Sequence, residues 1–190
     1  SNAAQKNKFD ELIVSAEEKL DSGQYDEALE LVAKAKKEYP EGSESTNSLN
    51  ENISIAKIST EALEQAKLQV KDKNYVEAIR SLNRVLKASD DLYLQAQSIS
   101  GEIRPLAVKA ALTKANQLAS EGKFLDALNI ISATKNAVGS TSELEKAKAA
   151  YDAAATKEQK QKRATAVSKM RAKKDGFTGI TWYRDRSSPI

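Results

Sequence analysis

Apolar residues recur every three or four positions along most of this chain, the spacing that places them on one face of an α-helix. The first such stripe contains Phe9, Leu12, Ile13, Ala16 and Leu20. Polar segments with Gly, Pro, Ser or Asp separate the stripes and supply helix ends. The pattern predicts helices over residues 4–22, 25–39, 45–72, 75–88, 91–121 and 124–137, with another that begins near Ser142. An all-α fold of antiparallel helix pairs is therefore expected.

One corner between two helices occurs three times in the sequence. A turn residue stands just before an aromatic residue, and an Ala followed by Leu or Ile comes three residues after the aromatic. These positions hold, copy by copy, Gly23, Tyr25 and Ala28, then Asn74, Tyr75 and Ala78, and lastly Gly122, Phe124 and Ala127. Gly and Asn tolerate the positive φ that a helix end requires, and a small Ala lets two backbones approach closely. Each copy therefore predicts a helix-turn-helix corner.

The repeated corner resembles the tetratricopeptide repeat over roughly residues 10–138. That family has small, Gly, aromatic, small, small and Pro residues at set positions, which the first copy fills with Ala16, Gly23, Tyr25, Ala28, Ala35 and Pro40. The second copy keeps Ala66, Tyr75 and Ala78 but has Lys73 for the glycine and Asp90 for the proline, and the third keeps Ala115, Gly122, Phe124 and Ala127. The resemblance implies three hairpins stacked as a right-handed α-solenoid over residues 4–155, plus a long C-terminal helix. Any helical hairpin can place Gly-x-aromatic at its corner, so an unrelated helical fold is the alternative.

The spacing of the copies departs from that family. Tyr25 and Tyr75 lie 50 residues apart and Phe124 follows 49 residues later, whereas a tetratricopeptide unit spans about 34 residues. About fifteen added residues make roughly four helical turns, so a helix can absorb them with its apolar face nearly in register. We expect long first helices and ordinary second helices. Pro105, four residues after Gly101, predicts a kink in the helix over 91–121 rather than a break.

The chain changes character after residue 155. The apolar stripe fades, and residues 156–174 are mostly Lys, Arg, Gln and Ala, which predicts a basic linker helix. Residues 175–190 then bring Phe177, Ile180 and Trp182 together with Gly and Thr, a composition typical of a strand. This stretch resembles the opening of a β-rich domain found in bacterial secreted proteins and lipoproteins; the alternative is a disordered tail. A lone strand needs partners, so self-association through this tail is a further expectation.

Composition removes several kinds of chemistry. The 190 residues contain no Cys and no His, which excludes disulfides, thiol catalysis, His-based acid–base catalysis and ordinary zinc sites. Neighbouring carboxylates such as Glu17 and Glu18 point apart on a helix, and no Gly-rich phosphate loop or Ser nucleophile motif occurs. We therefore expect no catalysis, no cofactor or metal, and no small-molecule substrate.

The resemblance to the tetratricopeptide repeat implies binding of another protein. The resemblance implies a groove, lined by first helices, that takes an extended segment or a helix of a protein partner. Chaperone-binding members of the family hold a terminal carboxylate with Lys and Asn, and Lys109 and Asn116 match such positions here. Their first-copy equivalents are Ile13 and Glu17, so carboxylate capture is not expected. The sequence thus predicts a non-catalytic scaffold whose groove residues are Lys67, Lys109 and Asn116.

The net charge of +3 is unevenly distributed. Residues 1–156 carry 20 Lys and Arg against 24 Asp and Glu, whereas residues 157–190 carry 10 against 3. Such a basic run suits anionic lipid or wall polymer, and nucleic acid less well because no aromatic interrupts it. The residues concerned are Lys157, Lys160, Lys162, Arg163, Lys169, Arg171, Lys173 and Lys174. A solvated linker, or a spacer that holds another domain away from a surface, is the alternative.

The ends of the chain bear on its location. No run approaches the roughly 20 apolar residues that cross a bilayer. Residues 1–3, Ser-Asn-Ala, resemble the remnant of a cleaved tag and are expected to lie outside the fold. No methionine start follows them, which suits the removal of a signal peptide or of another upstream segment. We therefore expect an extracytoplasmic or cell-envelope protein of bacterial type rather than a cytoplasmic one. If residues 175–190 open a β-rich domain, Ile190 is expected to be a boundary within a longer protein.

Overall fold

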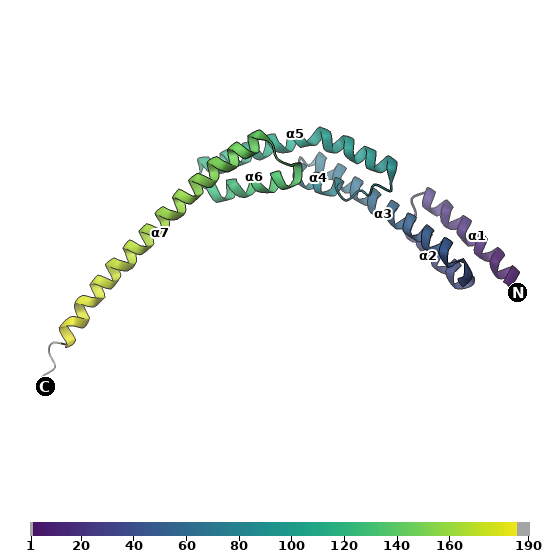
Figure 1. The fold of residues 1–190 in the computed structure, drawn as a ribbon, viewed down its shortest axis with the longest axis horizontal. Helices are drawn as coiled ribbons and strands as arrows, with labels where there is room; N and C mark the ends of the chain where they lie inside the picture. The colour runs from purple at the N-terminus through teal and green to yellow at the C-terminus, as the bar shows by residue number, and fades with distance from the viewer. Residues whose placement is uncertain (1, 186–190) are drawn as a thin grey trace. The chain divides into compact units, whose positions relative to one another are not determined.

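The computed structural model describes residues 2–185, apart from the side chains of Arg163, Ala172 and residues 174–185. These residues form helices and no strand, so the prediction of an all-α fold is confirmed. In chain order the elements are α1 (Asn2–Asp21), α2 (Tyr25–Glu38), the short 3₁₀ helix η1 (Pro40–Gly42), α3 (Ser43–Lys71), α4 (Tyr75–Leu82), α5 (Asp90–Ser120), α6 (Phe124–Val138) and α7 (Ser142–Asp185) (Figure 1). Helix α1 begins at Asn2, so it includes two of the residues expected outside the fold.

The chain divides into two compact units, and the division falls within α5. Unit 1 is Ser1–Ala107 and unit 2 is Val108–Ile190. In unit 1, α1 packs against α2, α2 against α3, and α3 against α4. In unit 2, α6 packs against α7. Neighbours in sequence are thus neighbours in space, as expected for helices joined by short turns.

The core of unit 1 mixes small and branched side chains. Ala16, Ala28 and Ile53 are fully buried, and Val32 and Leu49 nearly so. Partly buried side chains surround this cluster: Ile13, Leu20, Tyr25, Leu29 and Leu31. Because an alanine adds only a methyl group, the helices approach closely where alanines face each other. The predicted small positions of the other two copies, Ala66, Ala78, Ala115 and Ala127, are fully buried as well.

The three predicted corners share one backbone conformation. A residue with positive φ ends each first helix, at Gly23 (φ 74°), Lys73 (φ 60°) and Gly122 (φ 76°). Its amide donates to the carbonyl three residues back. The amide of the next residue donates to the carbonyl five residues before it, and this second bond is 2.8–2.9 Å long. This pair of bonds satisfies carbonyls that a helix end otherwise leaves open. The aromatic residue then begins the second helix, at Tyr25, Tyr75 and Phe124.

In the middle corner, the residue predicted to have the positive φ is not the one that has it. Asn74 was predicted to be the tolerant turn residue, yet its φ is −88°, like that of Gln24 in the first corner. The positive φ belongs to Lys73, the one residue other than glycine that has it among those described. A left-handed conformation costs a residue with a Cβ about 1–2 kcal/mol. The surrounding hydrogen bonds and packing of α3 on α4 impose the corner despite this cost.

Helix lengths follow the prediction from the long repeat. The first helices α1, α3 and α5 have 20, 29 and 31 residues, whereas the second helices α2, α4 and α6 have 14, 8 and 15. Helix α5 continues through Pro105 without a break, as expected. The added length of each repeat therefore lies in helix rather than in loop.

Helix α4 is shorter than the sequence predicted. The apolar spacing suggested a helix over 75–88, but α4 ends at Leu82. The fully buried Ser59 of α3 explains this, because its hydroxyl oxygen accepts a hydrogen bond from the Leu86 amide at 3.1 Å. The Ser89 hydroxyl lies 3.1 Å from the same oxygen. Ser59 thus holds the segment between α4 and α5 in a turn that the local sequence does not specify.

Helix α7 begins at Ser142, as the sequence predicted. Thr141 caps it, because the Leu144 amide donates to the Thr141 hydroxyl at 3.3 Å. Glu145, in the first turn, pairs with Lys135 of α6 at 2.6 Å and accepts a hydrogen bond from Ser140. The carboxylate therefore links α6 to α7.

The strand expected within residues 175–190 is wrong as far as residue 185. The backbone of α7 is helical without interruption from Ser142 to Asp185. A strand needs partners, and the described residues supply none. Extending a helix that has already formed costs aromatic and β-branched residues only up to about 0.7 kcal/mol each. Residues 186–190 lie outside the described part.

Candidate functional site: a groove between α1 and α3

A groove of about 540 Å³ lies between the first helices of unit 1. Two of its lining residues, Ile13 and Glu17, come from α1 and are the first-copy equivalents of the carboxylate-clamp positions. The others come from the beginning of α3: Glu44, Ser45, Ser48, Leu49 and Asn52. Spacings of three and four place each set on one helix face. The groove thus lies along the surface where a first-helix binding site was predicted.

The junction between α2 and α3 places the beginning of α3 near α1. Phe9 of α1 is buried, and its ring lies 5.6 Å from that of Tyr39, tilted by 59°. Gly42, the residue before α3, packs so tightly on Phe9 that an added Cβ would lie 2.5 Å from the Phe9 ring. Glycine is therefore required for this close approach. This contact between Gly42 and Phe9 sets the position of the beginning of α3, from which the Glu44 side chain extends.

The polar side chains of the groove have no partners within the described structure. Glu17 and Glu44 are exposed and make no ion pair there, and no lining residue is a Lys or Arg. The side chains of Ser45, Ser48 and Asn52 are exposed and make no hydrogen bond in that part of the chain. Elsewhere in unit 1 carboxylates do find cations, as in the Lys57–Asp26 pair at 2.6 Å. The groove therefore offers two negative charges and several hydrogen-bonding groups to a ligand.

Apolar surface completes the groove. Leu49 is buried beneath it and Ile13 is half-buried. Both belong to, or pack against, the core of unit 1, so their positions are fixed before any ligand arrives. A ligand that carries a cation next to an apolar side chain matches this combination of groups.

The three predicted groove residues do not line this groove. Lys67 of α3 and Lys109 of α5 are exposed and make no ion pair among the described residues. Asn116 accepts a hydrogen bond from the Tyr151 hydroxyl of α7, so its amide oxygen serves the fold of unit 2. Glu44, Ser45, Ser48 and Asn52 were not predicted from the sequence. Their signal was the polar face beside Leu49 and Ile53, which only becomes a groove once α1 lies opposite.

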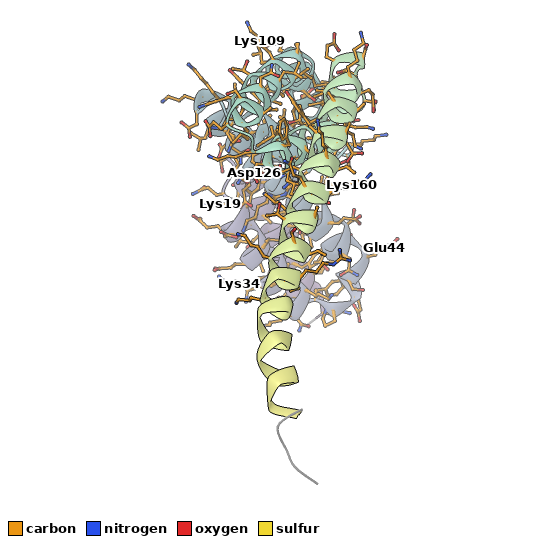
Figure 2. All side chains as sticks on the ribbon, turned by 90° about the vertical axis from the view of Figure 1, so that its left-hand side faces the viewer. Lys19, Lys34, Glu44, Lys109, Asp126 and Lys160 are labelled. Carbon is orange, nitrogen blue, oxygen red and sulfur yellow. The ribbon has the colours of Figure 1, made fainter. Side chains whose placement is uncertain are left out.

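The basic segment of α7 is exposed as predicted. Every described side chain between Gln159 and Lys173 is exposed, and Figure 2 shows Lys160 on the surface of the helix. Lys162 pairs with Glu158 one turn earlier. Lys157, Lys160, Lys169, Arg171 and Lys173 make no ion pair within the described part. The side chains of Arg163 and Lys174 lie outside the described residues.

Neither a cluster of metal ligands nor a membrane-spanning helix occurs among the described residues. No three Asp, Glu, His or Cys side chains come together as they would to hold a metal ion. No described helix combines the length and the apolar character that crossing a membrane requires.

Comparison with protein-family models, with curated proteins and with solved structures finds no match to this chain.

Proposed function

We propose that this chain is a non-catalytic helical-repeat scaffold that binds a segment of another protein in the groove between α1 and α3. On this proposal, three hairpins of tetratricopeptide type, α1–α2, α3–α4 and α5–α6, form a right-handed α-solenoid. The identical backbone of the three corners and the buried alanines of all three copies support the repeat. The groove of about 540 Å³ is the observation that supports binding of a protein segment.

Binding would follow from a groove that exists before the partner arrives. Its walls are two packed helices, so little conformational entropy is lost there on binding. Ser45, Ser48 and Asn52 provide donors and acceptors for a partner's backbone, while Ile13 and Leu49 provide apolar contact. These are the elements of peptide recognition by a helical array.

A peptide-library selection on the full chain tests the proposal. Peptides enriched on the unaltered chain should lose at least about tenfold in affinity for a Glu17→Lys/Glu44→Lys variant, because two exposed attractive charges become repulsive. A Glu51→Lys/Glu64→Lys variant has the same change of charge on exposed α3 residues outside the groove and should bind within about twofold of the unaltered chain. Fluorescence anisotropy measures each affinity.

Two results would reject the groove as the peptide-binding site. One is a selection that enriches no peptide over background. The other is a set of enriched peptides that bind both charge-reversed variants equally well. Amide shifts of Ser48 and Asn52 in NMR spectra, on addition of an enriched peptide, provide a second measure of where it binds.

Polyanion binding through residues 157–174 is the second candidate function. The exposure of every described cation in this segment favours it. Binding of an anionic lipid vesicle or a DNA duplex should weaken steeply as salt is raised and be lost when the chain is truncated after Thr156. Binding that persists after this truncation would show that residues 157–174 are not the polyanion-binding site.

A further inference from the structure

We propose that the groove between α1 and α3 of one copy of this chain is occupied by the basic segment 157–173 of α7 from another copy. This rests on the proposed function of the groove as a binding surface, and it names the occupant. The segment and the groove have complementary charge and complementary apolar groups. Apart from the Lys162–Glu158 pair, their charged side chains make no ion pair in the described part of the chain.

First, the described side chains in the second half of α7 are not packed against other helices. Leu144, Tyr151 and Ala155 are buried where α7 lies along α6. Beyond Glu158 every described side chain is exposed, and in Figure 1 the end of α7 extends past α6. Most helices in proteins depend on packing of an apolar face, because an isolated helix is marginally stable in water. A docking partner would provide that packing.

The second step is the match of charge. Lys157 and Lys160, and further along Lys169 and Lys173, lie three or four residues apart and so share helix faces. None of the four forms an ion pair in the described part of the chain. Glu17 and Glu44 in the groove also lack a cation. Bringing the segment to the groove pairs charges that are otherwise left to solvent.

The third step is the match of apolar groups. Val167 is 51% exposed and Met170 is 71% exposed, and their spacing places them on one face of α7. The groove presents Ile13 and Leu49 between its polar groups. An anionic polymer would use the lysines alone, whereas a helix docked in the groove uses the lysines and this apolar pair. The lysines together with this apolar pair therefore favour a protein surface as the partner. The groove is a protein surface with negative charge, opposite to that of the lysines.

Docking of this kind joins unlike surfaces. The groove belongs to unit 1 and the basic segment to unit 2. A contact between unlike surfaces is heterologous, and each added copy leaves a free groove and a free segment unless the assembly closes into a ring. The expected behaviour is mass that increases with concentration.

Sedimentation velocity of the full chain over a concentration series tests the proposal. We expect weight-average mass to increase with concentration at low salt. Association should weaken at least about tenfold in the groove variant Glu17→Lys/Glu44→Lys and in a segment variant with Lys157, Lys160, Lys169 and Lys173 all changed to Glu. The Glu51→Lys/Glu64→Lys control should associate like the unaltered chain. Circular dichroism verifies that each variant is folded.

Mixing the variants gives the decisive measurement. The groove variant and the segment variant each lose the contact with their own kind, but each keeps one unaltered surface. In a mixture the unaltered segment of the groove variant meets the unaltered groove of the segment variant, and the new lysines of one also match the new glutamates of the other. Their mixture should recover association that neither shows alone. Failure of the mixture to associate while the unaltered chain does overturns the assignment of these two surfaces.

Other outcomes also overturn the self-docking and separate it from the proposed function. A chain that stays monomeric at every concentration rejects docking by a second copy. If library peptides still bind in a groove-dependent manner, the groove serves a different protein and the proposed function stands. If those peptides also ignore the groove variant, both proposals fail.

Discussion

The hairpins of unit 1 and the second half of α7 are built from similar residues but differ in what holds them. Both are rich in Ala and Lys, which are good helix formers. In unit 1 an apolar stripe on each helix meets its neighbour, and Ala16, Ala28 and Ile53 are excluded from solvent. In α7 the stripe ends at Ala155, and every described side chain from Gln159 to Lys173 is exposed.

This difference separates two origins of helical structure. Intrinsic propensity contributes at most a few tenths of a kcal/mol per residue between good helix formers, whereas one buried branched side chain contributes about 1.5–3 kcal/mol. The hairpins therefore have stability that depends on particular contacts. The exposed segment has helical structure that depends on sequence composition alone, and it keeps its surface available for a partner.

The largest expected effect comes from a core truncation in the hairpins. Ile53→Ala removes a fully buried side chain from the centre of unit 1 and should reduce the free energy of unfolding by about 2–5 kcal/mol. Met170→Ala in the exposed segment should change it by less than about 0.5 kcal/mol. Chemical denaturation measures both. Equal effects would show that the segment is packed in solution.

A buried hydroxyl gives the next effect. Ser59→Ala leaves the Leu86 amide without its acceptor and should cost about 1–3 kcal/mol. The matched control is Ser54→Ala, because the Ser54 hydroxyl bonds only to the Asn50 carbonyl of its own helix and should contribute little. Hydrogen exchange of the Leu86 amide should accelerate in the first variant and not in the second. Unchanged exchange in both would contradict the role given to Ser59.

The corners should respond in opposite directions to matched changes. Gly23→Ala introduces a Cβ at φ 74° in open space, so conformational strain alone should destabilise the chain by about 1 kcal/mol. Lys73→Gly relieves the same strain in the middle corner and should stabilise it by up to about 1 kcal/mol. Thermal unfolding compares the two. A loss of stability in Lys73→Gly would mean that the lysine side chain contributes more than its backbone costs.

The smallest effect is a pH dependence at the junction of α6 and α7. Hydrogen bonds from Lys135 and then Ser140 lower the pKa of the Glu145 carboxyl below its usual value. A lowered folded-state pKa means that the stabilisation is present above the unfolded pKa of about 4.3 and is lost as the pH falls through the folded value. The melting temperature should therefore decrease on acidification below about pH 4.3.

A variant isolates this contribution. Glu145→Gln should melt lower than the unaltered chain at neutral pH and should lose less of its stability on acidification. Glu51→Gln, at an exposed carboxylate without a described ion pair, provides the control. Parallel pH profiles for Glu145→Gln and the unaltered chain would contradict the assignment.

The candidate site shows where prediction from sequence reached its limit. The resemblance to the repeat predicted a binding face on the first helices, with Lys67, Lys109 and Asn116 as its residues. Ile13 and Glu17, which line the groove, were named only as first-copy equivalents of the clamp positions. The predicted residue Asn116 turned out to be engaged by Tyr151, which is 35 residues away in the chain. Such a contact depends on how two helices pack, and no local pattern contains it. The same applies to Gly42, whose need for a small residue comes from the Phe9 ring.

The sequence by itself determined the helices, the three corners and the buried alanines, because helix periodicity and turn chemistry act over a few neighbouring residues. Tertiary structure decided the end of α4, since a buried hydroxyl from α3 captured the Leu86 amide. It also placed a positive φ on Lys73 against local preference. The groove arose in the same way, because its two walls are separated along the chain and acquire a common surface only when α1, α2 and α3 pack together.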